Sequence, residues 1–310
     1  MGRILVTPRS VTKNGHPALD RLPAAGHEVV LGPPGRQPTE DELVRLVCDC
    51  QGYLAGVEPV TSRVLQSAPL LRVISRNGTG IDNVDLRAAE ARGIAVLRAD
   101  GANARGVAEL TIGLMFALAR NLPASDARMK AGAWEREIGV ELEGRTLGVV
   151  GCGRIGKLVA QRALGIGMQV IAHDAYPDKT FSPGTGFRIA AFDEVLARAD
   201  FLSLHCPPAA DASPLLDGQA LSRMKRGAFI INSARHQLIE IEALLAALEE
   251  GRIAGVALDV FDAEPPRDPR LACHPRVVAT PHIGGFTIES VGRAMDAAVD
   301  NLVRELAQVR

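Results

Sequence analysis

The stretch that decides the fold is VVGCGRIGKL, Val149–Leu158. It spaces Gly151, Gly153 and Gly156 as G-x-G-x-x-G, directly after the apolar run TLGVV and ahead of a helical pattern. In such a loop the first glycine allows a tight turn, the second lets the backbone approach a pyrophosphate, and the third lets helix pack close to strand. The free N–H groups of the helix start then face the phosphates. The stretch therefore predicts a dinucleotide-binding βα unit.

An acidic residue follows at the right distance. Asp174 ends the next apolar run, QVIAHD, 18 residues after Gly156. An acid at this position accepts hydrogen bonds from the adenosine ribose and repels a 2′-phosphate, so we expect NAD rather than NADP. The ordinary alternative for Asp174 is a helix N-cap. Methyltransferases also use a glycine loop, but the third glycine and the strands that follow favour a dehydrogenase.

Strands and helices alternate on both sides of the loop. From TLGVV onward, six apolar runs alternate with helical patterns, which predicts a doubly wound dinucleotide fold. The six runs are TLGVV, QVIAHD, FLSLHC, AFIINS, IAGVALD and RVVATPH. Five β-rich runs before the loop predict a second parallel sheet. They are RILVT, HEVVLG, GYLAGV, LRVISR and GIAVLR. A long apolar helix is expected at about residues 106–121, with Pro123 as its stop, and an amphipathic helix near the C-terminus. The expected class is α/β.

Length and composition narrow the function classes. A chain of 310 residues exceeds the usual single core, so two domains are expected. Its net charge of -1 and lack of basic stretches with aromatics argue against a nucleic-acid partner. The longest apolar run, Ile112–Ala119, is too short to span a membrane, and the N-terminus lacks a signal-peptide pattern. These features indicate a soluble globular protein without a membrane partner.

The cysteines suggest a reducing compartment. Five cysteines without a spacing pattern argue against a disulfide framework, so a cytoplasmic location is expected. Cys48 and Cys50 have no second ligand pair, and we predict no metal site there. Burial of both on one face of a helix is the better interpretation.

The C-terminal half holds residues suited to hydride transfer to a 2-keto acid. That chemistry needs a cation for the carboxylate, a proton donor, and a group that orients the donor. Arg235, after AFIINS, is suited to a bidentate grip on a carboxylate, and His282 in TPHIGG is a natural proton donor. Glu264 in DVFDAEPP could hydrogen-bond to the imidazole and keep it charged. Each residue also has an ordinary interpretation: a surface arginine, a loop histidine and a solvated acid. Spacing alone does not decide between these interpretations and the catalytic roles.

Eight segments together resemble the D-isomer-specific 2-hydroxyacid dehydrogenases, and phosphoglycerate dehydrogenase-like members most closely. They are SRNGTGIDNVDL, GVAELTIGLMFALAR, AGAWER, LGVVGCGRIG, HCPP, INSAR, GVALDVFDAEPP and TPHIGG. The resemblance implies that Arg235 binds the carboxylate, that His282 exchanges a proton with the carbonyl oxygen, and that Glu264 orients His282.

The resemblance also implies binding residues. The implied cofactor set is Gly151, Gly153, Arg154, Ile155, Gly156, Asp174, Cys206, Pro207, Ser233, Ala234, Asp259 and Gly284. In this set Arg154 and Ile155 meet the pyrophosphate, Cys206 and Pro207 line the adenosine side, and Asp259 contacts the nicotinamide amide. The family's carboxylate loop corresponds to Asn77, Gly78 and Thr79.

The same resemblance implies a domain organisation. Residues 1–100 and 283–310 would form a discontinuous, flavodoxin-like substrate domain, with a Rossmann-type NAD domain at 101–282 inserted into it. The chain ends 28 residues after His282, so we expect the short form without a regulatory domain. A homodimer is implied too, formed through the helix at 106–121 and the following arm.

Several positions depart from the family pattern. His236 and Gln237 stand where the family usually has two glycines after the arginine, which is either neutral drift or a change in specificity. Arg105 replaces a usually smaller residue, and the loop GVEPV, with Glu58, lacks the arginine that grips phosphate in some members. We expect His236, Arg105 and Arg136 to hold a second anionic group of the substrate.

These features predict an NAD-dependent D-2-hydroxyacid dehydrogenase. Its candidate substrates are 3-phosphoglycerate or another 2-hydroxy or 2-keto acid with a second anionic group. The alternatives are a glyoxylate or hydroxypyruvate reductase, and a non-enzymatic NAD-sensing binding protein of the same fold.

Overall fold

The computed structural model describes residues 2–308, which divide into two compact units. One unit holds the chain up to Asn103 together with the segment from Ile288 onward, and the other is Ala104–Thr287. The expected domain boundaries, 100/101 and 282/283, each lie a few residues before the limits of these units. Near the second limit, the Ile283 and Gly284 N–H groups donate hydrogen bonds to Asp259, which ties this segment to the second unit.

The first unit is built on a parallel five-stranded sheet in the order β2-β1-β3-β4-β5. This is the flavodoxin-like order, as expected. Its strands are β1 (Arg3–Val6), β2 (Glu28–Leu31), β3 (Cys50–Ala55), β4 (Val73–Arg76) and β5 (Ala95–Arg98).

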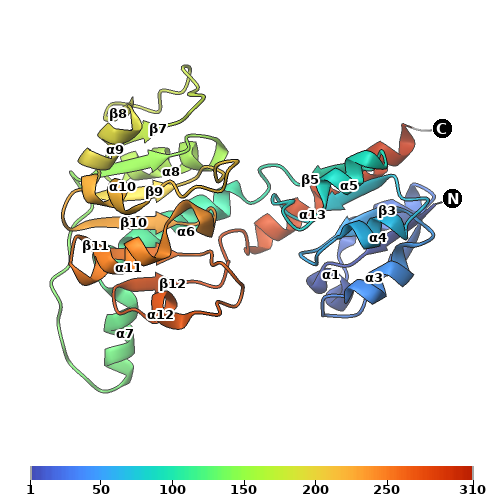
Figure 1. Ribbon diagram of the computed structural model, residues 1–310, viewed down its shortest axis with the longest axis horizontal. Helices are drawn as coiled ribbons and strands as arrows, with labels where there is room; N and C mark the ends of the chain where they lie inside the picture. The colour runs from blue at the N-terminus through green and yellow to red at the C-terminus, as the bar shows by residue number, and fades with distance from the viewer. Residues whose placement is uncertain (1, 309–310) are drawn as a thin grey trace. The chain divides into compact units, whose positions relative to one another are not determined.

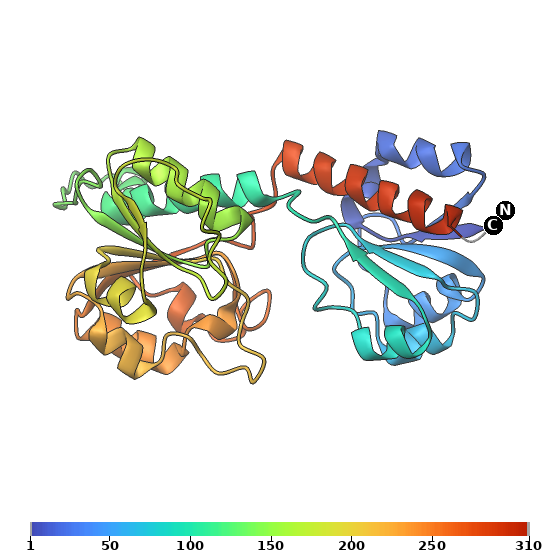
Figure 2. The same ribbon diagram turned by 90° about the horizontal axis from the view of Figure 1, so that it is seen from above.

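Helices cover both faces of this sheet, as Figure 2 shows. On one face lie α3 (Glu40–Val47), α4 (Ser62–Gln66) and α5 (Leu86–Ala91). On the other lie α1 (Arg9–Asn14), η1 (Pro17–Asp20), α2 (Arg21–Ala24) and α13 (Ile288–Ala307). The C-terminal helix α13 thus completes the core of the N-terminal segment, because it packs against β3, β4 and β5 and buries Met295, Val299 and Leu302 there.

The second unit holds a parallel seven-stranded sheet in the order β12-β11-β10-β9-β6-β7-β8 (Figure 1). Counted from β6, this is the Rossmann order with one further strand at the β12 edge. The strands are β6 (Thr146–Val150), β7 (Gln169–His173), β8 (Phe187–Ile189), β9 (Phe201–Leu204), β10 (Ala228–Asn232), β11 (Ile253–Leu258) and β12 (Val277–Ala279).

Two helical layers enclose the seven-stranded sheet (Figure 2). One layer contains α6 (Ala104–Ala119) and α8 (Arg154–Gly165), and the other contains α9 (Phe192–Arg198), α10 (Gly218–Arg223) and α11 (Ile241–Glu249). Both faces of every central strand are therefore buried, as a parallel sheet requires.

Three local expectations were wrong. The short strand β8 was missed; it has three residues and follows a loop rich in Pro and Gly. Helix α7 (Leu122–Lys130) was also missed: the long apolar helix α6 ends at Ala119, before Pro123 as expected, but Pro123 then lies in the first turn of α7, where its missing N–H is tolerated. Cys48 and Cys50 do not share a helix face, because α3 ends at Val47 and Cys50 begins β3, where it is buried while Cys48 is exposed.

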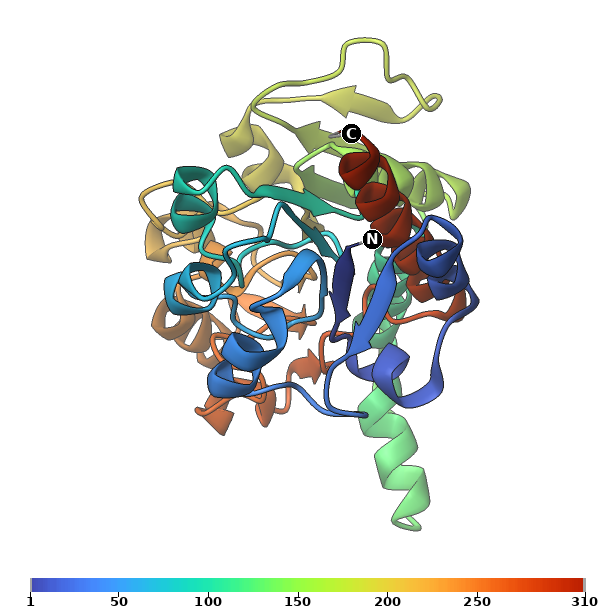
Figure 3. The same ribbon diagram turned by 90° about the vertical axis from the view of Figure 1, so that its right-hand side faces the viewer.

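Helix α7 has no buried residue and projects from its unit, in light green in Figure 3. No single helix within residues 2–308 is both long and apolar enough to cross a bilayer. Only α6 and α7 taken together reach that length and composition, and they are bent by 64°.

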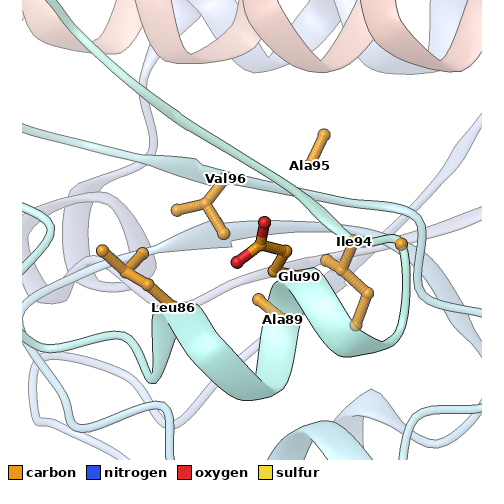
Figure 4. Close-up of a pocket in the computed structure, with 7 residues that line it drawn as sticks. Leu86, Ala89, Glu90, Ile94, Ala95 and Val96 are labelled. Atoms are coloured by element: carbon orange, nitrogen blue, oxygen red, sulfur yellow. The ribbon is translucent and has the colours of Figure 1, made fainter.

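A hollow on the first unit lies between α5 and β5 (Figure 4). Its lining is mostly aliphatic, and Glu90 is the ionisable side chain drawn there. None of the predicted site residues lines it.

Candidate active site

The predicted residues of the second unit follow strands that end at one level. Val150 pairs with His173 and Leu204, Asn232 pairs with Leu204 and Leu258, and Leu258 pairs with Ala279. The carboxyl ends of six parallel strands therefore form one edge, which is where open α/β sheets bind ligands. The residues that come next along the chain are Gly151, Asp174, His205, Ser233, Asp259 and Thr280.

The contacts of the glycine loop account for its glycines. A Cβ on Gly151 would lie 2.6 Å from the Cys206 backbone nitrogen, and one on Gly156 would lie 2.0 Å from the Gly151 oxygen. Both positions thus exclude a side chain, and Gly151 also has a φ of 89°. Gly153 differs, because a Cβ there would meet no atom within 4 Å. It is the N-cap of α8, so its open side is free for a ligand to approach the helix start.

Asp174 lies against this loop. One of its carboxylate oxygens accepts a hydrogen bond from the Cys152 N–H at 2.7 Å, and the other accepts from the Tyr176 N–H at 2.8 Å. Asp174 caps no helix, since the next regular element is β8. The second strand of the Rossmann order thus delivers a carboxylate to the glycine loop.

The other predicted cofactor residues lie around the same edge. Arg154 is exposed at the first position of α8, and Ile155 is half-buried against the α6–α8 core. Cys206 follows β9 with its thiol partly buried, which raises the pKa of that thiol. Pro207 is exposed beside it. After β10, the Ser233 hydroxyl lies 3.3 Å from the Thr111 hydroxyl, and the Ala234 N–H donates to Asn232.

Arg235 leaves the sheet after β10. Its backbone is extended, with φ -146° and ψ 141°, and it precedes the short 3-10 helix η2 (His236–Leu238). Its Nη1 donates to the Ala234 carbonyl at 2.7 Å. The side chain thus lies along its own turn at the edge where the glycine loop also lies.

His282 and Glu264 form a close pair. His282 Nδ1 lies 2.8 Å from both carboxylate oxygens of Glu264. Both side chains remain about half exposed, at 52% and 43%. An ionised carboxylate only accepts hydrogen bonds, so Nδ1 carries the proton and Nε2 stays available to a reacting group.

Asp259 holds the loop that carries His282. This carboxylate is 1% exposed. One oxygen accepts from the Thr280 hydroxyl at 2.6 Å and the Ile283 N–H at 2.8 Å, and the other accepts from the Gly284 N–H at 2.7 Å. These donors lie on both sides of His282, whose φ is 53°. The predicted contact of Asp259 with a nicotinamide amide stays a prediction, and its visible contacts are with the histidine loop.

In the first unit, the predicted carboxylate loop follows β4. Arg76 donates to the Asn77 carbonyl at 2.6 Å, and Asn103 donates to the Thr79 hydroxyl at 3.3 Å. Gly78 has a φ of 155°, and a Cβ there would lie 2.8 Å from the Arg76 guanidinium. The loop is thus held by its neighbours in a conformation that suits glycine.

The Glu58 side chain lies in the interior of the first unit. It is 1% exposed and accepts hydrogen bonds from the Tyr53 hydroxyl at 2.7 Å, the Gly56 N–H at 2.8 Å and the Thr7 hydroxyl. Burial, with the nearby Glu58 charge, raises the pKa of Tyr53 well above its usual value. The acid in GVEPV therefore serves the interior of its own unit.

The remaining predicted substrate residues have fewer contacts. Within residues 2–308, neither the Arg105 side chain nor the Arg136 side chain has a hydrogen-bond or ion-pair partner, and both residues are exposed. His236 is half-buried in η2 and Gln237 is exposed. Neither has a positive φ, so the family's glycines are not needed here for backbone reasons.

Two polar residues at this edge were missed by sequence reasoning. Asn232, 1% exposed, bonds to the Arg235 turn, and His205 has its Nε2 2.8 Å from the Ser203 hydroxyl. Burial lowers the pKa of His205 to about 4, so it stays neutral at physiological pH. The only sequence signal was that each stands at the end of an apolar strand.

Comparison with known proteins identifies the family of this chain. Residues 112–284 match the family described as D-isomer specific 2-hydroxyacid dehydrogenase, NAD binding domain. Over 257 residues the chain is 42% identical to a D-3-phosphoglycerate dehydrogenase of Methanocaldococcus jannaschii, covering 81% of this chain and 49% of the relative. The chain thus spans about half the length of the curated relatives it matches.

Solved structures match over nearly the whole chain. The TT0316 protein of Thermus thermophilus is 37% identical with a TM-score of 0.88, covering 99% of this chain and 97% of that one. A glyoxylate reductase of Paecilomyes thermophila is 28% identical with a TM-score of 0.85, covering 97% and 94%. On the fold, the glycine loop and these matches, this chain belongs to the D-isomer-specific 2-hydroxyacid dehydrogenase family.

Proposed function

We propose that this protein catalyses the NAD-dependent interconversion of a D-2-hydroxy acid and the matching 2-keto acid. The observation that carries the proposal is the contact of His282 Nδ1 with both oxygens of Glu264, each at 2.8 Å. It fixes the proton on Nδ1 and frees Nε2 for acid–base work, which typically contributes about 10²–10⁴ in rate. The glycine loop and Arg235 belong to the same unit.

The residues at the sheet edge fit NAD. The backbone around the open Gly153 would hold the pyrophosphate, and Asp174 would accept from the adenosine ribose. The negative charge of Asp174 disfavours a 2′-phosphate, which supports NAD over NADP. When bound, the reduced cofactor supplies the hydride that the carbonyl carbon accepts.

Each candidate side chain has a distinct task. Arg235 binds the substrate carboxylate through its guanidinium and polarises the neighbouring carbonyl. His282 gives a proton from Nε2 to the carbonyl oxygen during reduction and takes one from the hydroxyl during oxidation. Glu264 accepts the hydrogen bond from Nδ1–H and so orients the ring.

The substrate is proposed to be an acid with a second anionic group, 3-phosphoglycerate being one candidate. Arg105, Arg136 and His236 support this, because the two arginines are exposed without internal partners and His236 adjoins Arg235. Glu58 is inside its unit and does not oppose an anion.

A second candidate is reduction of a small acid, glyoxylate or hydroxypyruvate. The observation in its favour is the loop Gly56–Glu58, which offers no cation, whereas some relatives carry a phosphate-gripping arginine there. One of the structural neighbours, the Paecilomyes thermophila protein, is a glyoxylate reductase.

We also propose that the protein is a homodimer in the cytoplasm. On α6, α7 and the arm that follows, apolar side chains are exposed, with Trp134 at 82% and Ile138 at 100%. Such a patch is a usual sign of a protein interface. All five cysteines are free, which fits a reducing compartment.

The dimer is tested by light scattering on size-exclusion peaks. Ile138→Asp places a charge in the patch and should weaken dimerisation by about tenfold or more, since a buried unpaired charge is costly. Leu70→Asp, at a 51% exposed apolar residue outside the arm, is the matched control and should stay dimeric. A monomeric wild type, or equal masses for both variants, would overturn the proposal.

The activity is tested with a substrate panel. NADH consumption is followed with pyruvate, glyoxylate, hydroxypyruvate, 3-phosphohydroxypyruvate and a phosphonate keto acid. Turnover of the phosphorylated acid or the phosphonate far above the small acids supports the second-anion substrate, and the reverse supports the second candidate. Tight NADH binding with no turnover across the panel would contradict both and favour the non-enzymatic NAD-sensing alternative.

A further inference from the structure

The turn that carries Arg235 is tied to one buried side chain. Asn232 is the last residue of β10 and is 1% exposed. Its neighbours on the adjacent strands are Leu204 and Leu258, both buried. A primary amide in such surroundings costs stability unless both of its ends are hydrogen-bonded.

Both ends of this amide bond to the same turn. Asn232 Nδ2 donates to the Arg235 carbonyl at 2.8 Å, and Asn232 Oδ1 accepts from the Ala234 N–H at 3.0 Å. The Arg235 carbonyl also accepts from the Leu238 N–H at 3.2 Å. These bonds therefore fix the backbone on either side of the Arg235 Cα. They also fix the point from which the Arg235 side chain projects.

Asn232 is also connected to the strand that supports His282. Its carbonyl accepts from the Asp259 N–H at 3.0 Å, and the Asp259 carboxylate holds the loop around His282. Two buried polar residues at the ends of neighbouring strands thus fix the two loops from which Arg235 and His282 project.

We propose that Asn232 is a positioning residue that sets the direction of the Arg235 guanidinium toward the substrate carboxylate. This proposal rests on the proposed function of Arg235. A small displacement of a carboxylate-binding arginine weakens substrate binding and carbonyl polarisation together, because both depend on the same two N–H donors. The glycine loop and Asp174, which would hold the pyrophosphate and the ribose, follow other strands. Ser233 and Ala234 are the proposed cofactor residues on this turn, so only a small change in NADH affinity is expected.

The positioning role requires the hydrogen-bonding groups of the Asn232 amide and not only a side chain of the same shape. Asn232→Asp keeps the acceptor for Ala234 but removes the donor and places a carboxylate oxygen against the Arg235 carbonyl oxygen. Asn232→Ala removes both bonds. The matched control is Asp200→Ala, because Asp200 bonds to the Thr146 N–H at 2.8 Å at the opposite, amino-terminal end of the same sheet.

The test measures kinetics, NADH affinity and backbone exchange in these variants. For Asn232→Ala and Asn232→Asp we expect kcat/KM for the keto acid to fall roughly 10–100-fold, mostly through KM, with the Kd for NADH within about twofold of wild type. Asp200→Ala should lose thermal stability without this kinetic change. Equal kinetic losses in Asp200→Ala and Asn232→Ala, or an unchanged kcat/KM in both Asn232 variants, would overturn the proposal.

A second measurement stays decisive if the wild type turns over none of the acids. Hydrogen–deuterium exchange of the peptide covering residues 233–238 should rise about tenfold in Asn232→Ala and stay at the wild-type rate in Asp200→Ala. Exchange that does not change in Asn232→Ala would refute the positioning role by itself. Faster exchange in a protein that binds NADH but reduces no acid would instead contradict the proposed function.

Discussion

At the scale of single residues, the site combines a strained backbone with a buried carboxylate that holds it. His282 adopts a φ of 53°, a left-handed conformation that a non-glycine residue adopts only at some cost. Asp259 accepts hydrogen bonds from Thr280, Ile283 and Gly284, on both sides of that residue. Strain of this kind persists where the surroundings fix it, and it is common where a side chain must point in one direction.

Replacement of Glu264 by Gln tests the orienting role. Gln keeps one hydrogen-bond acceptor for His282 but replaces the second carboxylate oxygen by an NH₂ group, which cannot accept from Nδ1–H. We expect kcat/KM for keto-acid reduction to fall about 10–100-fold, while fluorescence titration shows unchanged NADH affinity. Wild-type kinetics in this variant would mean that Glu264 is only a solvated loop acid.

His205 predicts a pH dependence of stability. Burial lowers its pKa from 6.5 to about 4 in the folded protein. Between these values the unfolded chain binds a proton that the folded chain does not, so the free energy of unfolding decreases as the pH falls. The loss attributable to His205 is at most about 3 kcal/mol.

Chemical denaturation at about pH 7 and about pH 5 checks this sign. His205→Gln keeps a partner for Ser203 and does not titrate, so its midpoint should decrease less on acidification than that of the wild type. Identical pH slopes for the two proteins would show that His205 does not carry this dependence.

At the scale of elements, the features with a periodic sequence pattern could be predicted, and the short elements without one could not. The βα alternation, the glycine loop and the strand ends could be predicted, because hydrophobic period and glycine spacing are properties of the sequence itself. Strand β8 and the start of α7 at Leu122 could not, because a three-residue strand and a proline in a first turn leave almost no periodic signal. The side chains that hold the site, Asn232 and Asp259, depend on contacts across strands.

The glycine loop allows two substitutions with opposite consequences. Ala at Gly156 places a Cβ 2.0 Å from the Gly151 oxygen, so we expect a loss of about 1–3 kcal/mol or more in stability. Ala at Gly153 meets nothing within 4 Å and should fold normally, yet its methyl occupies the space toward a bound pyrophosphate.

The measurements are the thermal midpoint and the Kd for NADH. Gly153→Ala should keep the wild-type midpoint and weaken NADH binding by about tenfold or more. Gly156→Ala should lower the midpoint. Normal NADH affinity in Gly153→Ala would place the pyrophosphate elsewhere.

At the scale of the whole molecule, two doubly wound units share one chain, and the C-terminal helix α13 returns to the first. The two sheets could be predicted from the sequence, because one series of strands precedes the glycine loop and the other begins at the strand that leads into it. The exact limits of the units depend on contacts such as the hydrogen bonds that the Ile283 and Gly284 N–H groups donate to Asp259, which the sequence does not display. Arg105 and Arg136, the cations proposed to bind the second anionic group, are exposed, and their side chains have no partner within the described residues.

The most direct test of the central claim is the comparison of His282→Asn with the wild type. Asn accepts the left-handed backbone of this position, so the loop should keep its conformation. With the keto acid that the wild type reduces best, we expect turnover to fall by about 10²–10⁴ while the Kd for NADH stays the same. Wild-type turnover in His282→Asn would contradict the assignment of His282 as the proton donor and, with it, the proposed mechanism.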